Sequence, residues 1–521
     1  MIRLCILFFL FFSSCSREKP SQLQIARLNL SRDPTVLDPR RARDLESITL
    51  IRMLFEGLTR MSQNGEAELA IADKVEIDNE RLRFVFHLRK SYWSNHDPLT
   101  AFDFATSWKT VLDPCFASDV AHYLYPIKNA RKAKMGEVDL EAVGVQALDE
   151  CTLLVELEQP TPYFLKLLTL PVFFPVPSTI VAKNSQWCTA AATLVCNGPF
   201  VLTTWEHANR LGFSKNALYW EENTVRLSSI DFFITTPDTA LQMFEKGKLD
   251  WSGSPLSSIP PDAMKNLKNS KQLEVSPFLA TAFYRINTAP QIKGKPNLLA
   301  DPKVRRSLAF AIDREKIVNH VLQGGEEAAR SLVPPQMGLQ KQGYFQDRNI
   351  EVLNPHFEDP LTISYLNSER NASIAQAIQN QWESTLRIKV HLEAIEPKTF
   401  FQRISNGEYQ IAAGSWTADF DDPINFLEVF KYKEGGANNT GWENQKYIDL
   451  LNRSYICEIE KERSELLKKA EEILMEEMPI IPIFHFSLNF IKNPQFAEVS
   501  LSPLGQIDLR SAYFTNISQQ R

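Results

Sequence analysis

Hydrophobic and polar residues alternate over residues 82–88, and this period of two predicts a strand with one buried face. Its apolar face consists of Leu82, Phe84, Phe86 and Leu88. After a turn at NHDP, apolar residues recur every three or four positions, which indicates an amphipathic helix. Thr100 and Asp103 have the spacing of a capping box at the start of this helix, and Pro114 ends it.

Segments with strand-like spacing and segments with helix-like spacing alternate along the rest of the chain. Asp301 at the N-cap and Pro302 at the first helical position predict a helix that closes at Gly324 and Gly325. Further helices are expected at 370–386 and 464–477, and further strands at 388–395 and 479–486. Because strands and helices alternate throughout, the sequence predicts an α/β fold.

Length and charge narrow the classes of function. A chain of 521 residues exceeds one ordinary core and predicts two to four domains. Its 57 basic and 63 acidic residues give a net charge of -6, and no dense basic stripe occurs, so nucleic acid is not expected as a partner. The 33 Phe, 13 Tyr and 9 Trp suffice for large cores and an aromatic-lined cleft.

The N-terminus predicts export and lipid anchoring. The apolar run from Leu4 to Phe12 is too short to span a bilayer, so residues 1–14 are predicted to be a signal peptide. Small residues directly precede Cys15, as in bacterial lipoproteins, and 15–24 would form a polar tether. An ordinary secretory signal followed by a chance cysteine is the alternative.

The remaining cysteines fit no zinc site, because their spacing lacks a C-x-x-C pair. Cys188 and Cys196 lie eight residues apart and form a candidate disulfide in an oxidising compartment. Two unpaired thiols are an equal alternative.

The stretch AGSWTADFDDP, residues 413–423, brings three carboxylates together without a cation. An EF-hand would need a later Glu ligand, and the apolar run that follows does not fit, so no metal is predicted. Nucleotide-binding and hydrolase motifs do not occur, so we predict neither an enzyme nor a cofactor. Asp421 and Asp422 are expected to shape a solvated turn, whereas Asp419 lies between Trp416 and Phe420 and is a stronger binding candidate.

Several motifs together carry a resemblance that runs from about residue 25 to the C-terminus. They are LDP (37–39), LFEGL (54–58), the segment 86–114, NGPF (197–200), DPKVRRSLAFAIDREKIV (301–318) and GSWTADFDDPINFL (414–427). Because these motifs occur together and in this order, the chain resembles the oligopeptide-binding proteins of ABC importers.

The resemblance implies a Venus flytrap of the periplasmic-binding-protein type II-like class, with two α/β ligand lobes and an extra bracing lobe. Lobe I would comprise 25–50, 178–278 and 487–521, lobe II, the brace, 51–177, and lobe III 279–486. It also implies a monomeric lipoprotein on the periplasmic or envelope side of a membrane. Such a protein captures oligopeptides by strand addition and hands them to an ABC permease. The alternative is the same fold with a non-peptide ligand, such as a metal chelate, haem or a sugar.

The resemblance also implies the ligand contacts. Asp419 matches the aspartate that binds the α-ammonium group of the peptide. The predicted ligand-binding residues are Asp33, Thr35, Trp416, Thr417, Ala418, Asp419 and His485. The family's disulfide positions are Ala280 and Thr417 here, and an arginine that assists with the ligand carboxylate is replaced by Ala413. These departures are compatible with an unusual peptide, for instance one derived from the cell wall.

Overall fold

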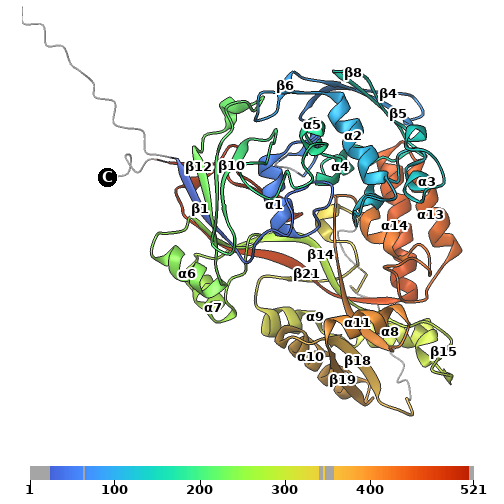
Figure 1. The fold of residues 1–521 in the computed structure, drawn as a ribbon. Coiled ribbons are helices and arrows are strands. Elements are labelled where there is room, and N and C mark those ends of the chain that lie inside the picture. Colours follow the sequence, from blue (N-terminus) through green and yellow to red (C-terminus); the bar gives the residue numbers. More distant parts are fainter. Residues whose placement is uncertain (1–23, 63–64, 340–343, 346–356, 516–521) are drawn as a thin grey trace, which may run out of the picture.

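The computed structural model describes residues 24–62, 65–339, 344–345 and 357–515. Two sheets of four strands and one of seven form its framework (Figure 1). Within these ranges no helix combines the length and the apolar character needed to cross a bilayer. Cys15, with the predicted signal peptide and most of the tether, lies outside the described residues.

The first sheet unites distant parts of the chain. Its order is β1 (Ile25–Leu30), β12 (Ser229–Ile234), β11 (Arg210–Lys215) and β10 (Phe200–Glu206). Only β1 and β12 run parallel to each other. Just before β1, the side chain of Gln24 accepts a hydrogen bond from the Phe514 amide at 2.6 Å and donates one to the Phe514 carbonyl at 3.2 Å. Both ends of the described chain therefore meet at this sheet.

The second sheet lies within the predicted bracing lobe. Its order is β4 (Ala72–Ile77), β5 (Arg83–Leu88), β9 (Thr152–Glu156) and β8 (Val145–Asp149), with α2 (Ala101–Leu112) packed on it. The structure confirms the expected strand and the capping box of Thr100 and Asp103. Trp108 of α2 is fully buried and donates to the Phe173 carbonyl at 2.8 Å. The predicted helical face is thus core.

The third sheet contains the two longest strands. Its order is β13 (Trp251–Gly253), β21 (Ile480–Lys492), β14 (Glu274–Ile286), β20 (Ile411–Thr417), β18 (Leu361–Leu366) and β19 (Val390–Ile395), and β17 (Glu327–Ala328) also pairs with β21. Near its β19 end the sheet packs against α10 (Glu369–Thr385) and α11 (Pro397–Ser405). The predicted helix at 370–386 and strand at 388–395 are confirmed.

β14 and β21 cross between two parts of the molecule (Figure 1). One section of the pair joins 274–277 to 487–490 beside β13, and the other joins 281–285 to 480–485 beside β20. The register shifts between Pro277 and Thr281. This interruption coincides with the predicted limits between lobes I and III, although the lobe limits themselves remain predictions.

The NGPF and LFEGL motifs dock against each other. Asn197 accepts from the Glu56 amide at 3.2 Å and donates to the Glu56 carbonyl at 2.9 Å. A Cβ on Gly198 would lie 2.6 Å from the carbonyl carbon of Leu54, the last residue of α1 (Leu45–Leu54). Glycine is therefore needed for this close approach.

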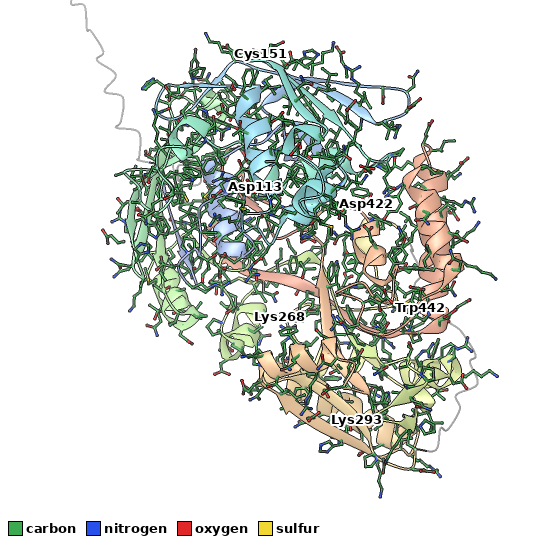
Figure 2. The ribbon with its side chains drawn as sticks, turned by 45° about the vertical axis from the view of Figure 1, so that its right-hand side comes forward. Asp113, Cys151, Lys268, Lys293, Asp422 and Trp442 are labelled. Carbon is green, nitrogen blue, oxygen red and sulfur yellow. The ribbon has the colours of Figure 1, made fainter. Side chains whose placement is uncertain are left out.

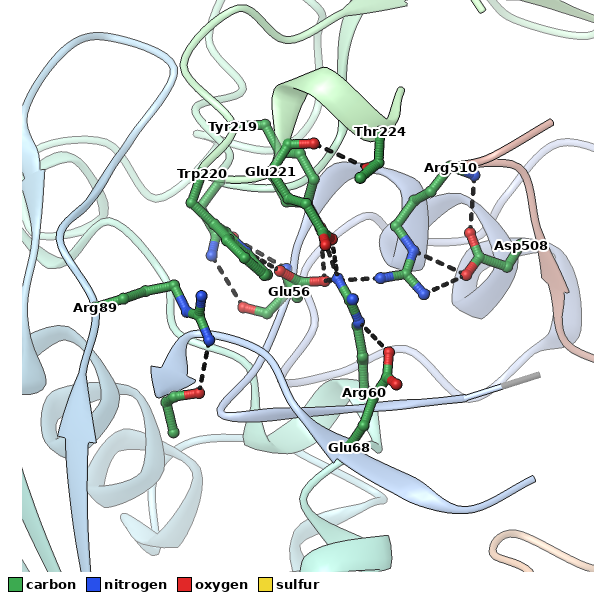
Figure 3. Close-up of polar contacts among 12 residues, drawn as sticks. Glu56, Arg60, Glu68, Arg89, Tyr219, Trp220, Glu221, Thr224, Asp508 and Arg510 are labelled. Carbon is green, nitrogen blue, oxygen red and sulfur yellow. Dashed lines mark hydrogen bonds and ion pairs between the residues drawn. The ribbon is translucent and has the colours of Figure 1, made fainter. Parts of the chain in front are cut away.

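Glu56 is also the centre of an ion-pair network that joins three segments (Figure 3). It accepts from Tyr219 at 2.8 Å and lies 3.3 Å from Arg60 and 3.5 Å from Arg510. Arg60 further pairs with Glu221 at 2.6 Å. The network connects the predicted brace with the middle and C-terminal segments of lobe I.

Two predictions require correction. The helix that begins at Pro302 does not continue to Gly324, because α8 (Pro302–Phe310) ends and Asp313 starts a new turn by accepting from the Lys316 amide at 3.1 Å. The predicted disulfide is not formed, since Cys188 and Cys196 are both free and buried. Burial raises the pKa of each thiol to about 12.

Glu471 on α14 (Glu460–Glu477) gives the fold a pH dependence. It is fully buried, it accepts from the Val333 amide at 2.7 Å, and burial raises its pKa to about 7. Protonated Glu471 therefore adds most to the free energy of unfolding below about pH 4.5, and this contribution falls as pH rises from 4.5 to about 7, above which the carboxyl is ionised in both states.

We expect the wild type to lose on the order of 3 kcal/mol of unfolding free energy between pH 4.5 and 8 through this group. Glu471→Gln should flatten that slope in chemical denaturation and be the more stable protein at pH 8. Equal slopes in both proteins would contradict the assignment.

Candidate ligand-binding site

β20 presents an open backbone edge. One edge pairs with β14 from Ile411 to Thr417, but the other pairs with β18 only at Ile411 and Ala412. Along Ala413–Thr417 no strand of the described chain covers that second edge. The side chains of Ser415 and Thr417 are exposed. An extended ligand can add to such an edge through main-chain hydrogen bonds.

Asp419 follows directly after this edge. Asn425 fixes the turn, because its Oδ1 accepts from the Trp416 indole at 2.9 Å and from the Asp419 amide at 3.3 Å. Burial raises the pKa of the Asp419 carboxyl, and hydrogen bonds from Tyr123 and Asn425 only partly offset that effect. Within the described ranges no cation forms a salt bridge with it. A half-buried carboxylate without a counter-ion is suited to receive a cationic ligand group.

The two neighbouring aspartates have other roles. The expectation of a solvated turn is wrong for Asp422, which is 7% exposed and makes two hydrogen bonds of 2.8 Å with the Arg463 guanidinium of α14. It also accepts from the Ile424 amide at 3.0 Å. Figure 2 shows Asp422 between the blue upper part of the ribbon and the red-orange helices at the right. The Asp421 carbonyl accepts from Lys166 at 2.9 Å. Among the described residues neither Asp419 nor Asp421 forms a salt bridge through its carboxylate, and Asp419 differs in lying directly after the open edge of β20.

The Asp419 turn docks on the predicted bracing lobe. Phe420 stacks on Tyr163 with ring centres 4.9 Å apart and an angle of 9° between the rings. Tyr123, the hydrogen-bond partner of Asp419, comes from the same lobe. On the strand side, the Ala418 amide donates to the Leu279 carbonyl at 2.8 Å. Contacts from two directions thus fix the turn.

Asp33 and Thr35 lie at the first sheet and have different neighbours. Asp33 accepts from the Ala208 amide at 2.5 Å, and the Thr35 hydroxyl donates to Asp44. The structure shows no direct contact between either residue and Asp419 among the described side chains. A ligand that contacts both groups must therefore bridge the two sheets.

His485 does not face an open cleft, contrary to prediction. It is 4% exposed, lies 2.8 Å from the Thr281 hydroxyl, and has its pKa lowered to about 4 by burial. Neighbouring side chains on a strand point to opposite faces, and Phe484 and Phe486 instead line a cavity of about 200 Å³. The structure therefore places the flanking phenylalanines, and not His485, on the wall of this cavity.

The cavity adjoins the open edge of β20 and includes residues that sequence reasoning missed. Its walls include Ala413, Ser415, Phe484, Phe486, Arg370 and Asn371. Arg370 and Asn371 lie in the first turn of α10, whose position the sequence predicted. The helix pattern alone did not reveal which of its residues face a cavity.

Comparisons with known proteins agree with this geometry. The family described as "Bacterial extracellular solute-binding proteins, family 5 Middle" matches residues 66–438. The oligopeptide-binding protein OppA of Bacillus subtilis is 37% identical, with 94% of this chain and 92% of that protein covered. The dipeptide-binding protein DppE of the same organism is 29% identical, with 96% and 93% covered.

A solved structure extends the match to the whole fold. The murein tripeptide-binding protein MppA in its unliganded open form has a TM-score of 0.82 and 27% identity, covering 96% of this chain and 99% of that one. This chain therefore has the type II periplasmic binding-protein fold. The chain belongs to the bacterial extracellular solute-binding proteins of family 5.

Proposed function

We propose that this protein captures peptides with a free amino terminus and delivers them to an ABC permease. The observation that carries the proposal is Asp419, an unpaired carboxylate directly beyond an open strand edge. The edge supplies main-chain hydrogen bonds that do not depend on ligand sequence, and the carboxylate supplies a partner for an α-ammonium group. The names of OppA, DppE and MppA support a peptide ligand, and MppA supports a cell-wall peptide.

The first test is to identify the ligand that the protein carries. Protein purified from its native envelope should release, on mild denaturation, a set of peptides that mass spectrometry identifies. Calorimetry with a bound peptide and its Nα-acetyl form should show much weaker binding of the acetylated form. A single non-peptide mass, such as a haem, a metal chelate or a sugar, would contradict the peptide proposal and would favour the same fold with a non-peptide ligand.

We also propose that Cys15 carries a lipid that holds the protein at the membrane. The small residues before Cys15 and the polar residues after it support this proposal. Cys15→Ser should abolish incorporation of labelled fatty acid and release the protein from membranes. Unchanged labelling of the variant would contradict the assignment.

A further inference from the structure

We propose that four lysines at one end of the predicted lobe I bind the anionic headgroups of phospholipids and hold this lobe against the membrane. They are Lys246 and Lys248 after α6 (Pro237–Glu245), and Lys268 and Lys271 at and after the end of α7 (Pro261–Asn269). We call this group the lysine end. The inference goes beyond the proposed peptide function, and its test does not depend on that function.

Two equivalent turns carry these lysines. α6 and α7 pack together through one apolar cluster. Lys248 precedes Trp251, the first residue of β13, by three positions, and Lys271 precedes Glu274, the first residue of β14, by three. β13 and β14 both run antiparallel to β21 and begin opposite its last residues, 490–492. The two turns therefore lie at the same end of the third sheet, on either side of β21.

The lysine end has an excess of positive charge. All four lysines are exposed, and none forms a salt bridge with another residue of the described ranges. The nearby acids already have partners, because Asp250 pairs with Arg27 at 3.1 Å and Glu274 pairs with Lys492 at 3.2 Å. Glu245, the last residue of α6, is exposed and has no salt bridge to a described residue. Four lysines against one such carboxylate leave a local charge of about +3 for an outside partner.

Helix stability does not account for all four positions. Asp238 and Asp262 lie in the first turns of α6 and α7, and basic residues near the last turns likewise favour the helix dipole. That effect falls off within the last turn, yet Lys248 and Lys271 lie beyond the helices. Their exposed charges remain available for binding.

β1 begins at the same end of the molecule. The Asp250 amide donates to the Arg27 carbonyl at 2.7 Å, and the Ser31 amide donates to the Leu256 carbonyl at 3.3 Å. β1 thus runs alongside β13 in the same direction, so both strands start at one end. Figure 1 shows β1, α6 and α7 together on the left side of the molecule.

The proposed lipid anchor lies within reach of this end. Cys15 precedes Gln24 by nine residues in the sequence, and nine residue steps span at most about 30 Å. The protein as a whole carries a net charge of -6, so an anionic bilayer would repel most of its surface. The lysine end is a local exception, and basic residues are attracted to anionic headgroups. Lobe I would then rest on the membrane, while lobe III contributes no residue to this contact.

Vesicle flotation tests the inference without a lipid anchor. The Cys15→Ser protein from the soluble fraction should bind vesicles that contain phosphatidylglycerol roughly 10- to 100-fold more tightly than phosphatidylcholine vesicles, since each lysine near an anionic surface adds about a five-fold factor. High salt should remove this preference. Changing all four lysines of the lysine end to Gln in the same background should also remove it.

A matched control removes the same number of charges from lobe III. It changes four exposed lysines that also have no salt bridge in the described part of the chain, namely Lys398, Lys446, Lys461 and Lys469, to Gln. This control should keep the preference for anionic vesicles. Both variants should melt at the wild-type temperature and bind peptide as the wild type does, so a failure here is distinct from a failure of the peptide function.

Acetylation of amines on the native lipoprotein gives a second measurement. In vesicles with phosphatidylglycerol the lysine end should be acetylated several-fold more slowly than in phosphatidylcholine vesicles, whereas the four control lysines should react equally in both. Equal binding of the unmutated lysine end to both kinds of vesicle, or an equal loss in the control variant, would overturn the inference. Binding to neither kind would also overturn it and would favour an acidic protein surface as the partner.

Discussion

Asp419→Asn should weaken binding of a free-amino peptide by roughly 10²- to 10³-fold while the melting temperature of the empty protein hardly changes. The isosteric amide keeps the shape of the turn and an acceptor for Tyr123. It removes the one charge that would balance a buried ammonium group. Loss of one partner from a buried ion pair costs about 3–5 kcal/mol, which gives this factor in affinity.

A double-mutant cycle makes that expectation specific. Nα-acetylation of the peptide should weaken wild-type binding by a similar factor and should add little to the Asp419→Asn defect, since both changes delete the same contact. Asp421→Asn is the matched control, because the Asp421 contact to Lys166 is made by its backbone carbonyl. Additive losses in the cycle would show that Asp419 does not bind the amino group.

Arg463→Met should destabilise the protein by about 3–5 kcal/mol, because it leaves Asp422 buried without its partner. The double variant Arg463→Met with Asp422→Asn should regain much of this loss, as no buried charge then remains. Arg43→Met removes an ion pair whose side chains are 70% and 68% exposed, and it should cost less than about 1 kcal/mol. Chemical denaturation measures all three.

The Arg463 variant also connects stability to binding. Asp422 helps to hold the turn that carries Asp419, so peptide affinity should fall together with stability in Arg463→Met. An unchanged free energy of unfolding in this variant would mean that the attraction between Arg463 and Asp422 only balances the cost of taking both charges out of water.

Local patterns predicted much of the framework and part of the site. The strand at 82–88, the capping box at Thr100 and the helix at 370–386 follow from side-chain spacing within one element. The ion pair of Asp422 and Arg463 could not be predicted in this way, because its partners lie 41 residues apart and meet only through packing. For the same reason, the orientation of His485 depends on the register of β21 against β14, which no local pattern determines.

The contact between Gln24 and Phe514, which are 490 residues apart, has a consequence for biosynthesis. β14 cannot gain its partner β21 until about 200 further residues have been made, and the ion-pair network around Glu56 awaits Arg510. Until then β14 has an unpaired edge and exposed apolar surface, the features that promote aggregation. Such late, long-range closure predicts slow folding, during which this edge of β14 stays without its partner.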